Sequence, residues 1–222
     1  MKLLAIDTAT EACSAALWVE GELKEIFQLA PRDHTRLILP MVERLLAQAG
    51  LHIRQLDAIA FGRGPGAFTG VRIATSVVQG IAFGADLPVV GVSTLAALAQ
   101  GAYRQRGAQR VLCALDARLH EVYWAQYQIE QGVAVLQGAE SLANPNNLAL
   151  PTGSDWHAAG NGWTIYRDSL QRRFQAQLLD DSRSDYPHAH DVAILAVNAY
   201  AQGLAVPAEE AQPVYLRDKV VA

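Results

Sequence analysis

A glycine-rich stretch in the first half of the chain has the residue types best suited to binding an anion. Four glycines and one proline fall within residues 62–70, after the apolar residues 56–61 and before residues 73–85, which read as a buried helix. A strand, a rigid loop and a helix N-terminus in this order would present backbone N–H groups and the positive end of a helix dipole. The stretch either cradles a phosphate or packs the helix tightly on a sheet. Because it lacks the Gly-Lys-Ser/Thr ending of a P-loop, both interpretations stay open.

Two arginines, Arg63 and Arg72, frame this loop and could add positive charge to it. They would attract a phosphate or an RNA backbone, or they would pair with carboxylates on the protein surface. The residues assigned to the glycine loop are Gly64, Pro65, Gly66, Thr69, Gly70 and Arg72.

An apolar strand that ends in aspartate occurs twice. Residues 2–7 and residues 111–116 both read as such a strand, and a polar turn and a hairpin follow each of them. We interpret the match as a duplicated α/β architecture with one lobe at residues 1–106 and a second at 107–222. A helix expected at residues 191–203 could pack back on the first lobe.

Hydrophobic periodicity and turn residues predict the elements that position these features. The expected strands are residues 3–7, 13–19, 22–29, 56–61 and 88–92 in the first lobe, and 111–116, 122–127, 133–136 and 156–159 in the second. The expected helices are residues from about 35 to 49, 73–85, 94–104 and 191–203, and residues 213–217 are expected to dock as an extended tail.

The histidines and cysteines do not have the spacing of a metal site. None of the six histidines forms a His-x-x-x-His pair, and Cys13 and Cys113 belong to no Cys-x-x-Cys motif. His188 and His190 flank a helix start beside Asp191, where a solvated loop is the usual interpretation. A metallopeptidase is therefore disfavoured, and no Gly-x-Ser-x-Gly elbow points to a serine hydrolase.

Composition indicates a globular protein with apolar surface to spare. Of the 222 residues, 51% are hydrophobic and 18% charged, and the formal net charge of −4 argues against strong autonomous nucleic-acid binding. Two cysteines outside any pair, an N-terminus that turns acidic too early for a signal peptide, and the lack of a long apolar run predict a cytoplasmic protein without a membrane span.

Two helices offer a surface for a protein partner. The helix at residues 73–85 is apolar or small almost all round, and Gly80 and Gly84 would allow another backbone to approach closely. The alternative is that both helices are enclosed within this chain. The residues assigned to the partner surface are Leu37, Ile38, Met41, Leu45, Ile73, Val77, Gly80, Ile81 and Gly84.

Four segments together resemble the TsaB (YeaZ) family. They are Leu4-Ala5-Ile6-Asp7-Thr8, the glycine motif from Gly64 to Arg72, Asp116-Ala117-Arg118 followed by Glu121-Val122-Tyr123, and Pro213-Val214-Tyr215-Leu216-Arg217. The match runs along nearly the whole chain and is poorest at residues 138–190. It implies two lobes, each built like half of an actin-like or sugar-kinase ATPase.

The resemblance also implies a function. Family members take part in making threonylcarbamoyladenosine beside the anticodon of tRNAs that read codons beginning with A. The chain would be a non-catalytic subunit that holds the catalytic paralogue TsaD, together with the ATPase TsaE, while TsaC supplies threonylcarbamoyl-adenylate. It would meet tRNA only through this complex, and it could form a homodimer when alone.

The nucleotide site of this fold looks degenerate in the sequence. ATPases of the fold bind phosphates at glycine-rich turns after the first strand of each lobe, whereas here Ala9 replaces the glycine of the first turn and residues 116–119 contain none. Asp7 and Thr8 are weak candidates for nucleotide contact. We expect no nucleotide on the isolated chain, with ATP or ADP possible within a complex. The competing hypothesis is an active small-molecule kinase or ATPase.

Overall fold

The computed structural model describes residues 1–175, 178–180 and 186–217, and these divide into two compact units. The first unit contains residues 1–97 and 187–214, and the second contains residues 98–186 and the C-terminal residues from 215. The sequence placed the boundary between the lobes at residues 106 and 107, which is the end of helix α3 (Thr94–Arg106). The structure instead divides the units inside α3, between residues 97 and 98.

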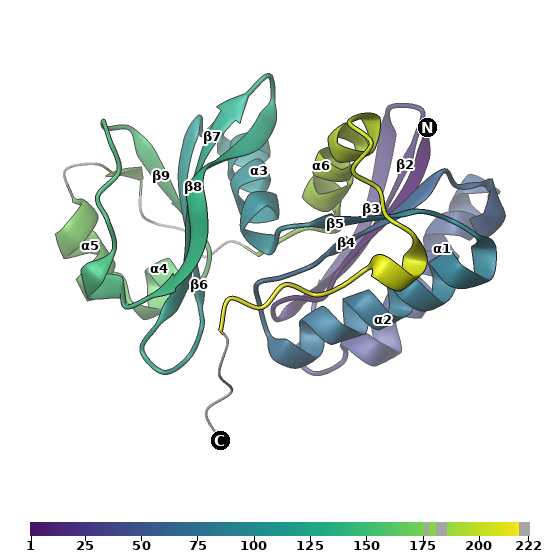
Figure 1. The fold of residues 1–222 in the computed structure, drawn as a ribbon, viewed down its shortest axis with the longest axis horizontal. Helices are drawn as coiled ribbons and strands as arrows, with labels where there is room; N and C mark the ends of the chain where they lie inside the picture. The colour runs from purple at the N-terminus through teal and green to yellow at the C-terminus, as the bar shows by residue number, and fades with distance from the viewer. Residues whose placement is uncertain (176–177, 181–185, 218–222) are drawn as a thin grey trace. The chain divides into compact units, whose positions relative to one another are not determined.

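The first unit contains a five-stranded sheet in the order β3-β2-β1-β4-β5 (Figure 1). Its strands are β1 (Lys2–Asp7), β2 (Ala12–Val19), β3 (Glu22–Leu29), β4 (Ala58–Gly62) and β5 (Val89–Val92). β2 runs antiparallel to its neighbours β1 and β3, while β1, β4 and β5 are parallel. The parallel strands read as continuous apolar runs because both faces of the sheet are covered.

Three helices cover this sheet. Figure 1 shows α1 (His34–Ala49) and α2 (Phe68–Ala85) on one face and α6 (Ala189–Ala201) on the other. The contacts of α6 with all five strands agree with the expectation that the helix near residue 191 packs on the first lobe. α2 begins earlier than the expected residue 73, because Gly70 packs inside the helix rather than in a loop. Thr69, Gly70 and Arg72 are therefore helical.

The second unit repeats the sheet of the first. Its order is β10-β9-β6-β7-β8, with β6 antiparallel to β7 and parallel to β9, as β1 is to β2 and β4. The strands are β6 (Arg110–Asp116), β7 (Val122–Glu130), β8 (Val133–Ala143), β9 (Trp156–Ala159) and β10 (Leu178–Asp180). This repetition confirms the duplicated, two-lobed α/β architecture.

Helices also lie on both faces of the second sheet, and two of them are short. α3 covers one face of its sheet, while α4 (Gly162–Ile165) and α5 (Arg167–Phe174) cover the other (Figure 1). Trp124, Trp163 and Phe174 pack together in the core between α4, α5 and the sheet, with ring centroids 5.1 to 6.1 Å apart. Within the described residues, short 3-10 helices lie at Ile53–Gln55, Pro145–Asn147 and Ala208–Glu210.

No helix among the described residues is both long and apolar enough to span a bilayer.

Candidate functional site

The glycine loop packs against the turn that follows β1. A Cβ atom on Gly66 would lie 2.4 Å from the carbonyl oxygen of Ala9, and one on Gly70 would lie 2.0 Å from that of Thr8. The Ala67 N–H donates to the Ala9 carbonyl at 2.7 Å, and the Thr8 hydroxyl donates to the Gly70 carbonyl at 2.7 Å. Carbonyl oxygens thus lie against the first turn of α2, where a phosphate would have to bind, so the geometry favours the tight-connection interpretation.

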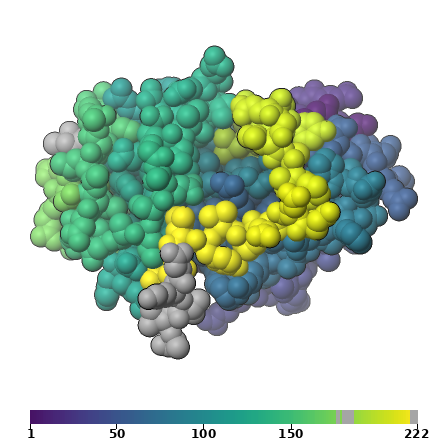
Figure 2. All heavy atoms as spheres, viewed as in Figure 1, coloured from purple at the N-terminus to yellow at the C-terminus, as the bar shows by residue number. Residues whose placement is uncertain are grey.

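The other side of the loop holds the C-terminal segment. Gly64 has a φ of +100°, and a Cβ there would lie 2.8 Å from the Val214 carbonyl oxygen. The Val214 N–H donates to the Arg63 carbonyl at 2.8 Å, which confirms that the tail docks in an extended form. Gln79 on α2 donates to the Ala211 carbonyl at 2.8 Å, and Figure 2 shows this C-terminal segment running over the surface of the first unit.

Asp7 is enclosed at the end of β1. One of its oxygens, Oδ1, accepts the Ala9 N–H at 2.9 Å, while Oδ2 has no hydrogen-bond partner among the described residues and abuts Gly62. Burial raises the pKa of Asp7 to about 7, although the Ala9 hydrogen bond and the charge of His188 lower it. Asp7 and Thr8 are fully buried, so neither candidate nucleotide contact reaches the surface.

The buried Asp7 carboxyl should make the free energy of unfolding depend on pH. Its pKa is about 7 in the folded chain and about 3.8 when unfolded, so the unfolded state loses its proton first. The Asp7 contribution to the free energy of unfolding is therefore largest below about pH 4 and falls, by at most about 4 kcal/mol, as the pH rises to 7. Asp7→Asn, which resembles the protonated acid, should gain stability relative to wild type between pH 5 and pH 8 in urea unfolding. A difference between the two proteins that does not change with pH would contradict the assignment.

Glu25 on β3 and Ser14 on β2 cap the N-terminus of α6. The Glu25 carboxylate accepts the His190 N–H at 3.0 Å and lies 3.1 Å from His188 Nδ1, and Ser14 Oγ accepts the Ala189 N–H at 2.9 Å. Burial would raise the pKa of Glu25, but the His188 and His190 contacts outweigh it and the pKa is lowered. The interpretation of His188 and His190 as a solvated loop is wrong, because side chains of the sheet hold them. The described residues contain no group of three metal ligands.

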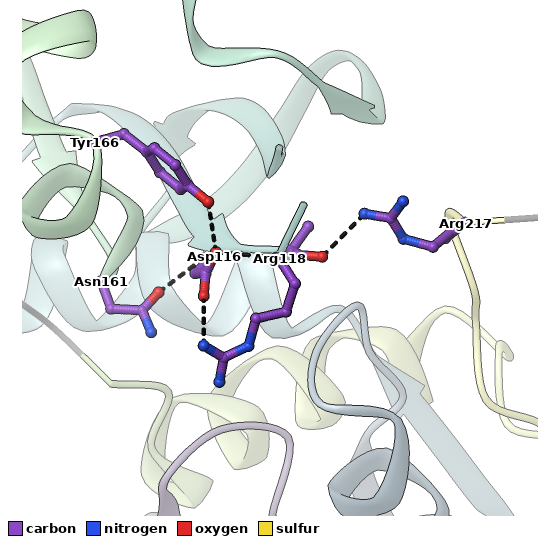
Figure 3. A network of polar contacts seen from close by, with 6 residues as sticks. Asp116, Arg118, Asn161, Tyr166 and Arg217 are labelled. Atoms are coloured by element: carbon purple, nitrogen blue, oxygen red, sulfur yellow. Dashed lines mark hydrogen bonds and ion pairs between the residues drawn. The ribbon is translucent and has the colours of Figure 1, made fainter. Parts of the chain in front are cut away.

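Asp116 at the end of β6 holds the corresponding turn of the second unit (Figure 3). Its Oδ1 accepts the Tyr166 hydroxyl at 2.8 Å and the Arg118 N–H at 2.9 Å, and its Oδ2 lies 3.2 Å from the Arg118 guanidinium. The Asp116 N–H donates to Asn161 Oδ1 at 2.9 Å. Burial and the bond to Asp116 raise the pKa of Tyr166 to about 12. The Asp116 carboxylate is therefore already hydrogen-bonded and ion-paired within the protein.

The turn at residues 160–162 packs on β6 and serves as a connection. A Cβ on Gly160 would lie 2.3 Å from the Ala114 carbonyl oxygen, and one on Gly162 would lie 2.8 Å from it. Both glycines are thus needed for the close approach of this turn to the β6 backbone.

The exposed part of the expected partner surface lies on α2 alone. Ile38, Met41 and Leu45 on α1 are at most 6% exposed and belong to the core, so their assignment to a surface is wrong: the apolar face of α1 covers the sheet. Leu37, Ile73, Val77 and Ile81 are half-buried against the same core. The exposed residues that recur along one side of α2, which we call the α2 face, are Thr69, Arg72, Ser76, Gly80, Phe83 and Gly84.

Phe83 is the most exposed large apolar residue of this face, at 79%. A Cβ on Gly80 or Gly84 would meet no atom within 4 Å, so neither glycine is required by packing inside this chain. At the first turn of α2 the Arg72 guanidinium lies 3.3 Å from the centroid of the Phe68 ring. The α2 face thus combines a bare backbone with an exposed aromatic ring.

Comparison with known proteins identifies the family to which the chain belongs. The family model described as TsaD, tRNA N6-adenosine threonylcarbamoyltransferase, matches residues 28–222. The tRNA threonylcarbamoyladenosine biosynthesis protein TsaB of Escherichia coli (strain K12) is 45% identical over 224 residues, which cover 99% of this chain and 96% of that protein. The chain belongs to the TsaB family.

Further TsaB relatives agree with this assignment. The protein of the same name from Haemophilus influenzae is 40% identical over 238 residues, which cover 99% of this chain and 95% of that protein. The solved structure of YeaZ from Pseudomonas aeruginosa is 51% identical, with a TM-score of 0.90 over 97% of this chain and 99% of that one. The resemblance stated from the sequence motifs is therefore confirmed.

The structure joins two of the TsaB-like motifs that the sequence left apart. Arg217, from the C-terminal motif, donates to the Ala117 carbonyl at 2.9 Å and pairs with Glu121 at 2.8 Å. Sequence reasoning did not link these residues, nor did it assign a site role to Phe83 or Glu25. For Phe83 a signal was available, since it lies one helical turn from Gly80.

Proposed function

We propose that this chain is a non-catalytic scaffold or activator subunit in tRNA threonylcarbamoyladenosine biosynthesis. The curated relatives at 45% and 40% identity are named for that process. In this proposal the chain binds a TsaD-type catalytic paralogue in the cytoplasm and, with it, a TsaE-type ATPase, and it meets tRNA only through the complex.

The observation that carries the proposal is the α2 face. Phe83 and the bare backbone at Gly80 and Gly84 leave apolar surface that no part of the described chain covers. Exposed apolar patches on globular proteins usually mark association sites, and paired small residues let two helices approach closely. In the absence of the paralogue, a homodimer formed through the same face would bury this apolar surface.

The test is the mass in solution of the chain alone, with a TsaD-type paralogue, and with that paralogue plus a TsaE-type ATPase. Light scattering coupled to size exclusion should give a heteromeric complex in which each chain is present. Persistence of the separate masses at micromolar concentrations would overturn the proposal.

The isolated chain should bind Mg-ATP poorly and hydrolyse none. Carbonyl oxygens of Thr8 and Ala9 lie against the first turn of α2, Asp7 is buried, and Asp116 is already bonded to protein donors. Calorimetry with Mg-ATP should therefore give no dissociation constant below about 1 mM, which corresponds to about 4 kcal/mol of binding free energy. Micromolar binding by the lone chain would instead favour the kinase or ATPase hypothesis. In the assembled complex, ATP or ADP binding is compatible with this proposal.

A further inference from the structure

The turn after β6 has an unusual backbone. Arg118, Leu119 and His120 have φ values of +62°, +54° and +60°, so three successive residues with side chains adopt the left-handed conformation. This conformation is costly for residues other than glycine, and it persists only where surrounding contacts impose it. We call residues 118–120 the left-handed turn.

Contacts within the second unit impose this conformation. The Ala117 N–H donates to the Glu121 carbonyl, and the Glu121 N–H donates to the Arg118 carbonyl, both at 3.0 Å. Asp116 binds the backbone and the guanidinium of Arg118, as Figure 3 shows. Arg217 reaches both Ala117 and Glu121 with one planar guanidinium, a geometry that lysine cannot reproduce.

These contacts engage the carboxylates of Asp116 and Glu121, while the side chains of residues 118–120 stay exposed to solvent. Asp116 and Glu121 are engaged, whereas the Arg118 side chain is 81% exposed, Leu119 is 61% exposed and His120 is exposed. The surface of the turn therefore offers hydrogen-bond donors around a large apolar side chain.

We propose that the left-handed turn is a preformed contact for a protein partner with an acidic, partly apolar surface, and that Arg217 is the positioning residue that holds it. The proposal rests on the proposed function, because it supplies a second contact for the same complex. The donors of Arg118 and His120 suit carboxylates or phosphates alike. The exposed Leu119 decides in favour of a protein, because an apolar side chain gains little against a phosphate backbone.

The test exploits the fact that glycine prefers this backbone. Leu119→Gly should keep or raise the melting temperature, because it relieves strain at an exposed position. It should nevertheless raise the dissociation constant for the catalytic paralogue, or for the ATPase in its presence, at least tenfold. Leu204→Gly is the matched control, since Leu204 is 60% exposed in the first unit, and it should leave both constants within twofold.

A double-mutant cycle tests the role of Arg217. Arg217→Ala should weaken binding as Leu119→Gly does, Arg217→Lys should not restore it, and the double variant should be no weaker than either single variant if both act through the turn. Additive effects would overturn the positioning role.

The outcomes separate this proposal from the proposed function. If wild type forms the complex and Leu119→Gly binds equally well, the left-handed turn is not a contact and the scaffold function stands. If wild type forms no complex, the scaffold function fails and this proposal with it. If Leu119→Gly weakens binding of a tRNA anticodon stem-loop but of neither protein, the turn contacts RNA and the protein-partner proposal is overturned.

Discussion

Gly70→Ala is expected to destabilise the first unit by about 3 kcal/mol or more. Alanine ordinarily stabilises a helix by about 1 kcal/mol relative to glycine, so propensity alone predicts the opposite sign. The added Cβ would lie 2.0 Å from the carbonyl oxygen of Thr8, which is backbone and cannot turn aside as a side chain would. Urea unfolding followed by circular dichroism measures the effect.

Two glycines of the same helix provide the matched control. Gly80→Ala and Gly84→Ala add the same methyl group where no atom lies within 4 Å, and each should stabilise by about 1 kcal/mol. Gly66→Val should destabilise as Gly70→Ala does, because its Cβ would lie 2.4 Å from the Ala9 carbonyl oxygen. Equal effects at positions 70 and 80 would show that backbone packing does not explain the glycine motif.

Gly80→Arg should leave the chain folded and reduce its association with a TsaD-type paralogue by about a hundredfold or more. The position is exposed and a Cβ there would meet no atom within 4 Å, so the folded chain has room for a side chain at this position. At a close helix–helix contact, however, the same side chain would clash and lose hydration without a counter-ion, at a cost of about 3 kcal/mol or more. Circular dichroism melting and titration calorimetry with the paralogue separate folding from binding.

Ala201→Arg is the control for added charge, because Ala201 is exposed at the end of α6 and away from the α2 face. It should leave association unchanged. A Gly80→Arg chain that is folded and binds as tightly as wild type would remove α2 from the interface, whereas an unfolded one would mean that Gly80 packs inside the chain.

The fold was largely predictable because its signals are local. Apolar strands ending in Asp7 and Asp116 mark the two repeats, and the hairpin after each strand follows from ordinary turn residues. The start of α2 was missed because a glycine such as Gly70 is usual in a loop. Glycine is required there because the Thr8 carbonyl, 62 positions away in sequence, leaves no room for a side chain. β10 was missed as well, since three residues carry too little periodicity to be read.

The site was less predictable because burial depends on tertiary structure. A helix with apolar residues at positions 38, 41 and 45 has one apolar face, but the pattern does not say whether a sheet or a partner covers it. The structure assigns that face of α1 to the core and leaves the α2 face exposed. In the same way, the sequence around His188 does not predict its contact with Glu25, because the two residues are 163 positions apart.

The discontinuous first unit has a consequence for synthesis on the ribosome. Its five strands have all been synthesised by residue 92, yet the helix that covers one face of their sheet begins at residue 189. The whole of residues 98–186 must be translated before α6 can dock, and its N-terminus is then capped by Ser14 and Glu25, made long before. Nascent chains thus carry an uncovered apolar sheet face while the second unit is being made. A ribosome that stalls before residue 187 would release a product prone to aggregation, although every strand of the first sheet is present.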